Sequence, residues 1–193
     1  MSTGERRSYA EAQAIAQRLY DVLEPACVRI TIAGSLRRKA PDIGDIELVL
    51  IPRLEPVVDP MFGLPTGKMR SAVDAKLTER GVSWPTKGER SRRFWWEGMQ
   101  ADLFVQPDPR TFGLNLFLRT GSAAFSHGAL GRLNRLGMRC EGARVWRGNE
   151  VLSTPEESCI FDLLEMDFVP PEERTKTFWE DHRELFRVRR AAS

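Results

Sequence analysis

The chain has 193 residues, of which 41% are hydrophobic and 29% charged, and its formal net charge at pH 7 is +2. This is the composition of an ordinary globular protein, long enough to bury the core of one domain or two small lobes, and it excludes a disordered chain. The sequence shows no signal-peptide pattern and no apolar run as long as a membrane span, so we expect a soluble, cytoplasmic protein without a membrane partner. Three scattered cysteines and two histidines indicate a reducing compartment and predict no Cys/His zinc site.

Basic residues are concentrated in the middle of the chain and acidic residues near its end. Residues 87–147 include 11 basic and 5 acidic residues, whereas residues 148–186 include 3 basic and 11 acidic ones. Arginine supplies 24 of the 29 basic residues, and its planar guanidinium suits bidentate contact with phosphate. These patterns favour a polyanionic partner on one face, although the codon usage of a GC-rich genome is an alternative cause of the arginine bias.

Hydrophobic periodicity and turn residues predict an α+β order of elements. The first element is a helix that begins with a capping box at Ser8 and Glu11 and ends near Pro25. The elements expected after it are strands at 28–32 and 46–51 with a short basic turn between them, a proline-rich loop at 52–65, a helix at 67–80, strands at 82–86, 92–96 and 99–105, helices from 112 and from 123 to 136, a hairpin at 144–152, and a capped helix from 154 to 169. The prolines at 107 and 109 predict a boundary between two domains, 1–107 and 108–193.

Asp45 and Glu47 form the first candidate site. Alternate side chains of a strand point to one face, so these carboxylates lie about 7 Å apart and repel each other unless a cation separates them. Mg²⁺ prefers oxygen ligands, and paired ions of this kind hold the attacking and leaving oxygens of a phosphoryl transfer. The alternative is that both acids lie on a solvated face and pair with arginines.

A candidate phosphate-binding segment precedes these acids. Gly34 and Ser35 stand where a strand passes into a turn, and backbone N–H groups and a hydroxyl can bind phosphate oxygens there. Arg37 and Arg38 follow directly and can add charge-assisted hydrogen bonds to the same group. A phosphate-binding turn close to a carboxylate pair is the combination that nucleotidyl transfer requires.

The ordered set of Gly34, Ser35, Arg38, Asp45 and Glu47 resembles the palm signature of the DNA polymerase beta family (X family) of nucleotidyltransferases. The resemblance implies a nucleotidyltransferase palm, a mixed β-sheet with helices on one side, followed by a small α+β thumb lobe. It also implies that the first three residues bind the incoming triphosphate and that the two acids bind two Mg²⁺ ions, with Mn²⁺ as an alternative. Glu47 stands where the family usually has aspartate.

The resemblance requires a third carboxylate on a nearby strand, and Asp102 fits this requirement. Met99, Ala101, Leu103 and Val105 share one face of the expected strand, which leaves Asp102 on the other. The implied role of Asp102 is catalytic, either as the general base for a primer 3′-hydroxyl or as a ligand of the metal that lowers the pKa of that hydroxyl.

The resemblance continues into the second half of the chain. Thr120, Gly121 and Ser122, followed by Phe125, are similar to the T-G-S-x-x-F motif that opens the family's nucleotide-selecting thumb. Nucleotide contacts are therefore implied for Thr120, Gly121, Ser122 and Ser126. The pattern of residues 157–174 is similar to the family's ending, so the likeness covers residues 10–174. It implies a reduced palm-plus-thumb form without lyase and fingers parts, as in some virus-encoded members.

Four arginines are the expected DNA contacts. Arg92 and Arg93 directly precede an aromatic run at 94–96, and Arg132 and Arg135 lie on the second helix of the later half. Arginine beside aromatic residues is typical of surfaces that bind nucleic acid strands. The alternative is a sheet face with core tryptophans and solvated arginines.

These patterns predict a monomeric, metal-dependent DNA polymerase that adds dNMP from dNTP to a DNA 3′ end. Its expected substrate is a primer-template or gapped DNA, as in gap or end filling during repair. Asp102 would promote attack on the α-phosphorus, while Ser35 and Arg38 would stabilise the leaving pyrophosphate. Two alternatives stay open: nucleotidyl transfer to RNA or protein, and a DNA-end-binding module with weakened catalysis.

Overall fold

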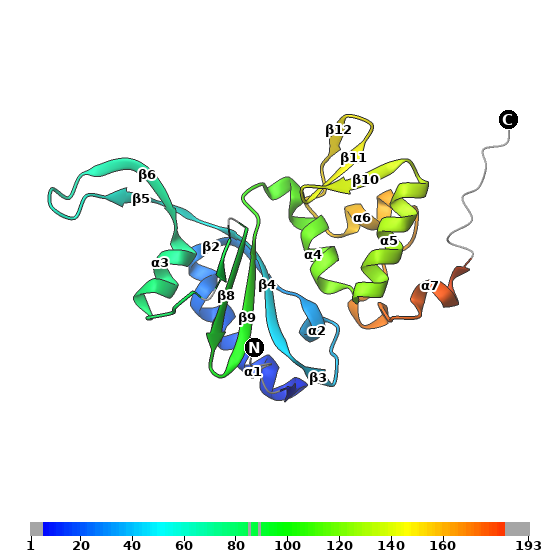
Figure 1. The fold of residues 1–193 in the computed structure, drawn as a ribbon, viewed down its shortest axis with the longest axis horizontal. Helices are drawn as coiled ribbons and strands as arrows, with labels where there is room; N and C mark the ends of the chain where they lie inside the picture. The colour runs from blue at the N-terminus through cyan, green and yellow to red at the C-terminus, as the bar shows by residue number, and fades with distance from the viewer. Residues whose placement is uncertain (1–5, 85, 89, 184–193) are drawn as a thin grey trace. The chain divides into compact units, whose positions relative to one another are not determined.

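The computed structural model describes residues 6–84, 86–88 and 90–183, and it has the predicted α+β class, with open mixed sheets. The chain divides into two compact units (Figure 1), one formed by residues 1–32 and 42–107 and the other by 33–41 and 108–193. A unit boundary therefore lies at Pro107, whereas the segment Ala33–Pro41 packs with the second unit although it precedes most of the first. Within the described residues, no helix combines the length and the apolar character needed to cross a bilayer.

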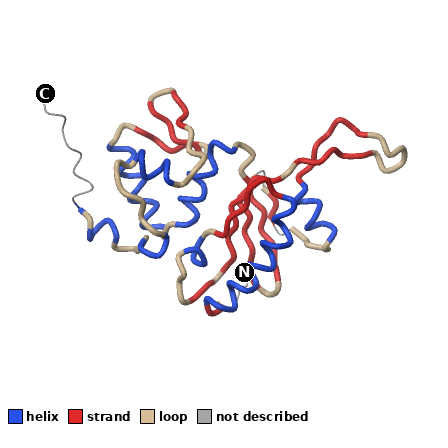
Figure 2. The backbone as a smooth tube through the Cα atoms, turned by 180° about the vertical axis from the view of Figure 1, so that it is seen from behind, coloured by secondary structure: helices blue, strands red, loops and turns tan. Residues whose placement is uncertain are grey.

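Unit 1 is built on a five-stranded sheet in the order β2-β4-β9-β8-β7. Its strands are β2 (Cys27–Ile32), β4 (Asp45–Pro52), β7 (Thr86–Lys87), β8 (Ser91–Trp96) and β9 (Met99–Val105). The β4–β9 pair is parallel and the other pairs are antiparallel. The helices α1 (Tyr9–Leu23) and α3 (Ala72–Glu79) lie on one side of this sheet (Figure 2). Unit 1 also contains a short antiparallel pair of β1 (Arg7–Ser8) with β3 (Asp42–Ile43). The 3-10 turn η1 (Glu24–Ala26) connects α1 to β2.

Local signals in unit 1 predicted most of these elements. The capping box of α1 is confirmed, because the Ser8 side chain accepts from the Glu11 N–H and the Glu11 carboxylate accepts from the Ser8 N–H. The predicted strands at 28–32, 46–51, 92–96 and 99–105 are confirmed within one or two residues. The strand expected at 82–86 is wrong for residues 82–84, position 85 lies outside the described residues, and Thr86 pairs with Arg93 at the sheet edge.

The region from 52 to 80 differs from the prediction. A hairpin of β5 (Leu54–Val58) and β6 (Pro65–Ser71) replaces the expected loop and the first part of the expected helix. Prolines are tolerated here because a two-stranded ribbon has two free edges, which leave some backbone N–H positions unpaired. The helix α3 begins only at Ala72, where the Ser71 hydroxyl caps it, and it ends before Gly81 as predicted.

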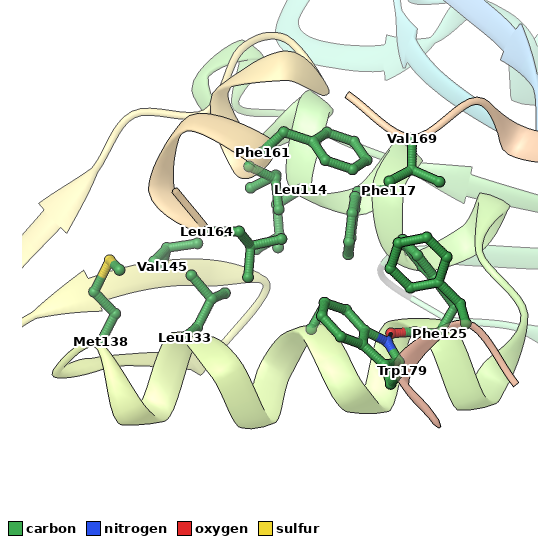
Figure 3. Packing of buried hydrophobic residues seen from close by; sticks show 13 residues of the cluster. Leu114, Phe117, Phe125, Leu133, Met138, Val145, Phe161, Leu164, Val169 and Trp179 are labelled. Carbon is green, nitrogen blue, oxygen red and sulfur yellow. Dashed lines mark hydrogen bonds between the residues drawn. The ribbon is translucent and has the colours of Figure 1, made fainter. Parts of the chain in front are cut away.

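Unit 2 packs helices and a small sheet around an apolar core (Figure 3). The helices α4 (Phe112–Thr120) and α5 (Ala123–Arg135) are confirmed, as is the hairpin of β11 (Arg144–Arg147) and β12 (Glu150–Leu152). The sequence did not predict β10 (Met138–Glu141), which adds a third strand to this hairpin. The remaining elements are α2 (Gly34–Arg37), η2 (Pro109–Thr111), α6 (Ser158–Leu163), η3 (Pro171–Glu173) and α7 (Phe178–Asp181).

The predicted helix from Thr154 is wrong in both its start and its length. Thr154 does not cap a helix, since its backbone N–H donates to the carbonyl of Arg110 and its carbonyl accepts from Gly113. Glu157 also forms no capping box, because its carboxylate binds two arginines described below. Backbone hydrogen bonds to a distant segment therefore hold Thr154, and α6 begins only at Ser158.

Candidate functional site

The three predicted carboxylates of unit 1 lie on one face of neighbouring strands. In the parallel pairing of β4 with β9, Glu47 stands opposite Asp102 and Asp45 stands opposite Gln100. Neighbouring strands are about 4.8 Å apart, so side chains at opposite positions of one face are adjacent. The alternate residues Ile46 and Leu48, which point to the other face, are fully buried. Asp45 and Glu47 are half-buried and Asp102 is buried.

Asp102 is held by an arginine of the next strand. The Arg93 Nε lies 2.7 Å from Asp102 Oδ1 and the second guanidinium nitrogen lies 2.9 Å from Oδ2, which is a bidentate ion pair. Gln100 adds a hydrogen bond of 3.2 Å to Oδ2. Hydrogen bonding and charge from Asp102, with a further contribution from the charge of Asp45, raise the pKa of the Arg93 guanidinium. Arg93 was predicted to contact DNA, and in the structure its guanidinium lies beside the predicted catalytic acids Asp102 and Asp45.

The sequence contained a signal for this pairing that the prediction missed. β8 and β9 are joined by Glu97 and Gly98, which have φ of +46° and +78°. Positive φ at both central residues is typical of the two-residue hairpin turn that matches strand twist. Such a turn fixes the register, and counting outward from it places Arg93 opposite Asp102.

The donor atoms of this face fit Mg²⁺, because carboxylate oxygens are the ligands that hard divalent cations prefer. Among the described residues, however, no group of three or more His, Cys, Asp or Glu side chains is close enough to hold a metal ion. The bidentate bond from Arg93 uses one lone pair of each Asp102 oxygen, and each oxygen keeps a second lone pair that could bind a metal ion. Arg93 therefore competes with a metal ion for the charge of Asp102 without excluding it.

The predicted phosphate-binding turn belongs to unit 2. Gly34 is buried and has φ of +63°, a conformation that glycine adopts without strain, and it turns the chain from β2 into α2. Ser35 and Arg38 are half-buried. Arg38 donates to the carbonyls of Thr120 at 2.5 Å and Gly121 at 3.2 Å. The structure therefore brings the Gly-Ser turn and the Thr-Gly-Ser motif together within one unit.

The Thr-Gly-Ser motif also forms the junction of α4 and α5. Ser122 caps α5 by accepting from the Phe125 N–H at 3.2 Å, and its hydroxyl donates to the carbonyl of Thr175. Thr120 is fully buried, and its hydroxyl accepts from Arg37 at 2.6 Å. The hydroxyl of Ser126 donates to the carbonyl of Leu118 at 3.3 Å. The hydroxyls of these three predicted nucleotide contacts therefore bind the protein's own groups.

A buried carboxylate that the sequence analysis did not single out as a site residue organises this region. Glu157 accepts from Arg37 at 2.9 and 2.7 Å and from Arg174 at 2.6 Å. Burial alone would raise the pKa of Glu157, but the hydrogen bonds and charges of the two arginines outweigh it and hold the pKa below its ordinary value of 4.5. Glu157 and Arg37 both lie in polar stretches of the sequence, where nothing reveals a partner 120 residues away.

Two of the four predicted DNA-binding arginines lie in the interior. Arg92 pairs with Asp74 at 2.9 Å and also donates to the carbonyl of Gly88. Arg132 donates to the carbonyls of Leu164 and Glu165. Both side chains are buried, so the expectation that they contact DNA is replaced by a structural role. Arg135 is exposed, as the prediction requires.

Comparison with models of known protein families finds no match to this chain, and comparison with curated protein sequences finds none either. A functional assignment therefore depends on the chemistry and geometry of the residues themselves. Those residues comprise a carboxylate face in unit 1 and an arginine-rich turn in unit 2.

Proposed function

We propose that the chain is a metal-dependent nucleotidyltransferase that adds dNMP from dNTP to a DNA 3′ end, as the resemblance to the DNA polymerase beta family implies. In this proposal unit 1 is a nucleotidyltransferase palm and unit 2 is a thumb. One observation supports it most: Glu47 and Asp102 stand opposite each other on parallel strands, with Asp45 two residues away on the same face. Like charges at adjacent positions of a strand pair repel, so this arrangement requires a cation; Arg93 supplies one for Asp102, and Mg²⁺ would supply another in the proposed reaction.

The residues of the chain would have distinct roles in this reaction. Asp45, Glu47 and Asp102 would hold Mg²⁺, which when bound supplies Lewis-acid stabilisation of the phosphoryl oxygens. Asp102, held in orientation by Arg93, would orient the primer 3′-hydroxyl or accept its proton. Ser35 and Arg38 would donate hydrogen bonds to the leaving pyrophosphate.

Primer extension on gapped DNA tests this proposal. The wild-type protein is incubated with a one-nucleotide gap, each dNTP or NTP in turn, and Mg²⁺ or Mn²⁺. We expect incorporation by the wild type and a loss of about a thousandfold or more in Asp45→Ala, because electrostatic stabilisation is commonly the largest single contribution to catalysis. Asp21→Ala, which removes an exposed acid of α1, is the matched control and should retain activity. Equal incorporation by wild type and Asp45→Ala would overturn the proposal.

A DNA-end-binding module with weakened catalysis is the second candidate. The bidentate pairing of Arg93 with Asp102 favours it, because this ion pair satisfies the carboxylate without a metal. Glu47 in place of the family's aspartate points the same way, since octahedral Mg²⁺ tolerates displaced ligands poorly. This candidate predicts salt-sensitive binding of gapped DNA, with no metal-dependent incorporation in the same samples.

A further inference from the structure

A surface groove of unit 2 has the chemistry of a binding site that the proposed function does not use. A hollow of about 790 Å³ lies between the end of α6, the loop at 165–169, and α7, and a second hollow of about 390 Å³ adjoins it. Glu173, Phe178 and His182 line both hollows, so the two form one continuous depression. We call it the acidic groove; its further lining residues used below are Asp162, Glu165, Asp167 and Phe168.

Aromatic rings form part of the groove wall. Phe168 is 49% exposed although it lies 4.8 Å from Phe161 between ring centroids. Phe178 and His182 stack with their ring centroids 4.3 Å apart and 21° between the planes. Phe178 is only 7% exposed, so Phe168 supplies the ring face that a cation could reach. An exposed aromatic in a hollow often marks a contact site.

Four carboxylates surround these rings, and all four are exposed: Asp162, Glu165, Asp167 and Glu173. No side-chain hydrogen bond or ion pair to a described residue involves any of them, in contrast to Glu172, which pairs with Lys39 at 2.6 Å. All four belong to the acidic segment of the sequence, residues 148–186, which has 11 acidic and 3 basic residues. A groove of this charge repels nucleic acid and attracts cations.

The groove carboxylates are too far apart to hold a single metal ion, which favours a cation with several separated charges. The described residues include no group of three or more carboxylates, thiols or imidazoles that could hold a metal ion. The positive charge that complements the groove must therefore be spread over several positions. The volumes of the two hollows, about 790 and 390 Å³, are also larger than one ammonium group would fill. They are large enough for a peptide with apolar and charged side chains.

We propose that the acidic groove binds a basic peptide segment of a partner protein. Arginine or lysine side chains would lie against the exposed ring of Phe168, and their charged ends would pair with the surrounding carboxylates. Apolar peptide side chains would contact Val169 and Met166, which also line the larger hollow. The inference does not depend on the proposed nucleotidyl transfer, because no carboxylate of the groove belongs to the face of β4 and β9.

Fluorescence anisotropy tests the inference with a short fluorescein-labelled peptide that alternates arginine and leucine. An analogue with glutamine in place of every arginine is the ligand control. We expect saturable binding of the arginine peptide to the full chain, a large loss of affinity in high salt because exposed charges are screened, and no binding of the glutamine peptide. The chain has two histidines, so changes in the imidazole resonances of His182 on titration, with His127 unchanged, would locate the peptide in the groove.

Charge-neutralising variants supply the decisive comparison. Glu165→Gln with Asp167→Asn removes two groove charges, and Glu150→Gln with Glu180→Gln removes two exposed charges that do not line it. We expect the first pair to weaken peptide binding by about tenfold or more, which corresponds to about 1.4 kcal/mol, and the second to change it little. Equal loss in both pairs would show attraction to net charge alone and overturn the inference, as would the absence of saturable binding by the wild type. Thermal unfolding of each variant checks that the fold is kept.

Discussion

Arginine binds carboxylate in both units, but the two sites differ in what surrounds the pair. In unit 2, Glu157 binds Arg37 and Arg174, and the side chains of Glu157 and Arg174 are 6% and 0% exposed. In unit 1, Asp102 binds Arg93, whose side chain is 53% exposed, while Asp102 itself is 10% exposed. The comparison teaches that one chemical pair can serve two purposes. Where both partners are enclosed the pair is part of the fold, and where the cation faces water it can be exchanged for another cation.

The enclosed site is also held by its surroundings. The Arg174 guanidinium lies 5.1 to 5.6 Å from the ring centres of four phenylalanines, among them Phe117 and Phe161. One guanidinium nitrogen of Arg174 is buried without a hydrogen-bond partner in the described structure, so its charge depends all the more on Glu157. Removing one member of a buried pair leaves the other charge uncompensated, which costs more than the pair itself contributes.

The largest effect that we predict follows from neutralising Glu157. Glu157→Gln leaves two arginines, one of them fully buried, without their counter-charge. We expect the free energy of unfolding to fall by about 3–5 kcal/mol, as for other broken buried ion pairs. Urea unfolding followed by circular dichroism measures this. Glu172→Gln, which removes the exposed partner of Lys39, is the matched control and should change stability little. Equal losses in the two variants would contradict the distinction between enclosed and open pairs.

Acid should weaken the enclosed pair in a defined direction. The folded-state pKa of Glu157 lies below its ordinary value of 4.5, so in acid the unfolded chain binds a proton at this residue before the folded chain does. The stabilisation by ionised Glu157 is therefore complete above pH 4.5 and is lost as the pH falls through the folded-state pKa. The stability difference between wild type and Glu157→Gln should shrink in acid, as urea unfolding at a series of pH values would measure. A difference that stays constant down to strongly acidic pH would contradict this.

The contrast also explains which features the sequence could predict. The alternation of a strand was sufficient to place Asp45 and Glu47 on one face, and the capping residues were sufficient to start α1 at Tyr9. These are local signals, carried by residues within one element. The parallel pairing that sets Glu47 opposite Asp102 joins strands separated by a hairpin, a helix and two further strands. The sequence therefore predicted that the two strands belong to one site but did not predict their register.

The features that were not predicted depend on contacts between distant segments. Glu157 finds Arg37 across 120 positions, and neither residue has a local pattern that identifies the other. Arg92 and Arg132 have the sequence context of surface arginines, but Asp74 and the carbonyl of Leu164 hold them in the interior. The prolines of β5 and β6 hid this hairpin from sequence-based prediction. They are acceptable there because no further strand of the described residues pairs with the hairpin.

The smallest predicted change in stability is at the open pair, where the more informative measurement is metal binding. Arg93→Gln removes the cation beside Asp102, and the ion pair of so exposed an arginine should contribute only about 0–1 kcal/mol to the free energy of unfolding. The same substitution leaves Asp102 without its guanidinium and removes a positive charge that Asp45 also feels. If these acids hold a metal, as the proposed function requires, Arg93→Gln should bind Mn²⁺ several-fold more tightly, because the guanidinium no longer competes with the ion for the charges of Asp102 and Asp45.

Electron paramagnetic resonance of free Mn²⁺ measures this affinity without any need for turnover, and Arg18→Gln is the matched control. Arg18 forms an exposed pair with Glu97 within the same unit, at a distance of 3.0 Å, so its removal alters net charge equally without touching the carboxylate face. Tighter Mn²⁺ binding in Arg93→Gln than in Arg18→Gln would identify Arg93 as a cation that competes with the metal. Equal affinity in the two variants would contradict competition between Arg93 and the metal, and the open pair would then be structural like the enclosed one.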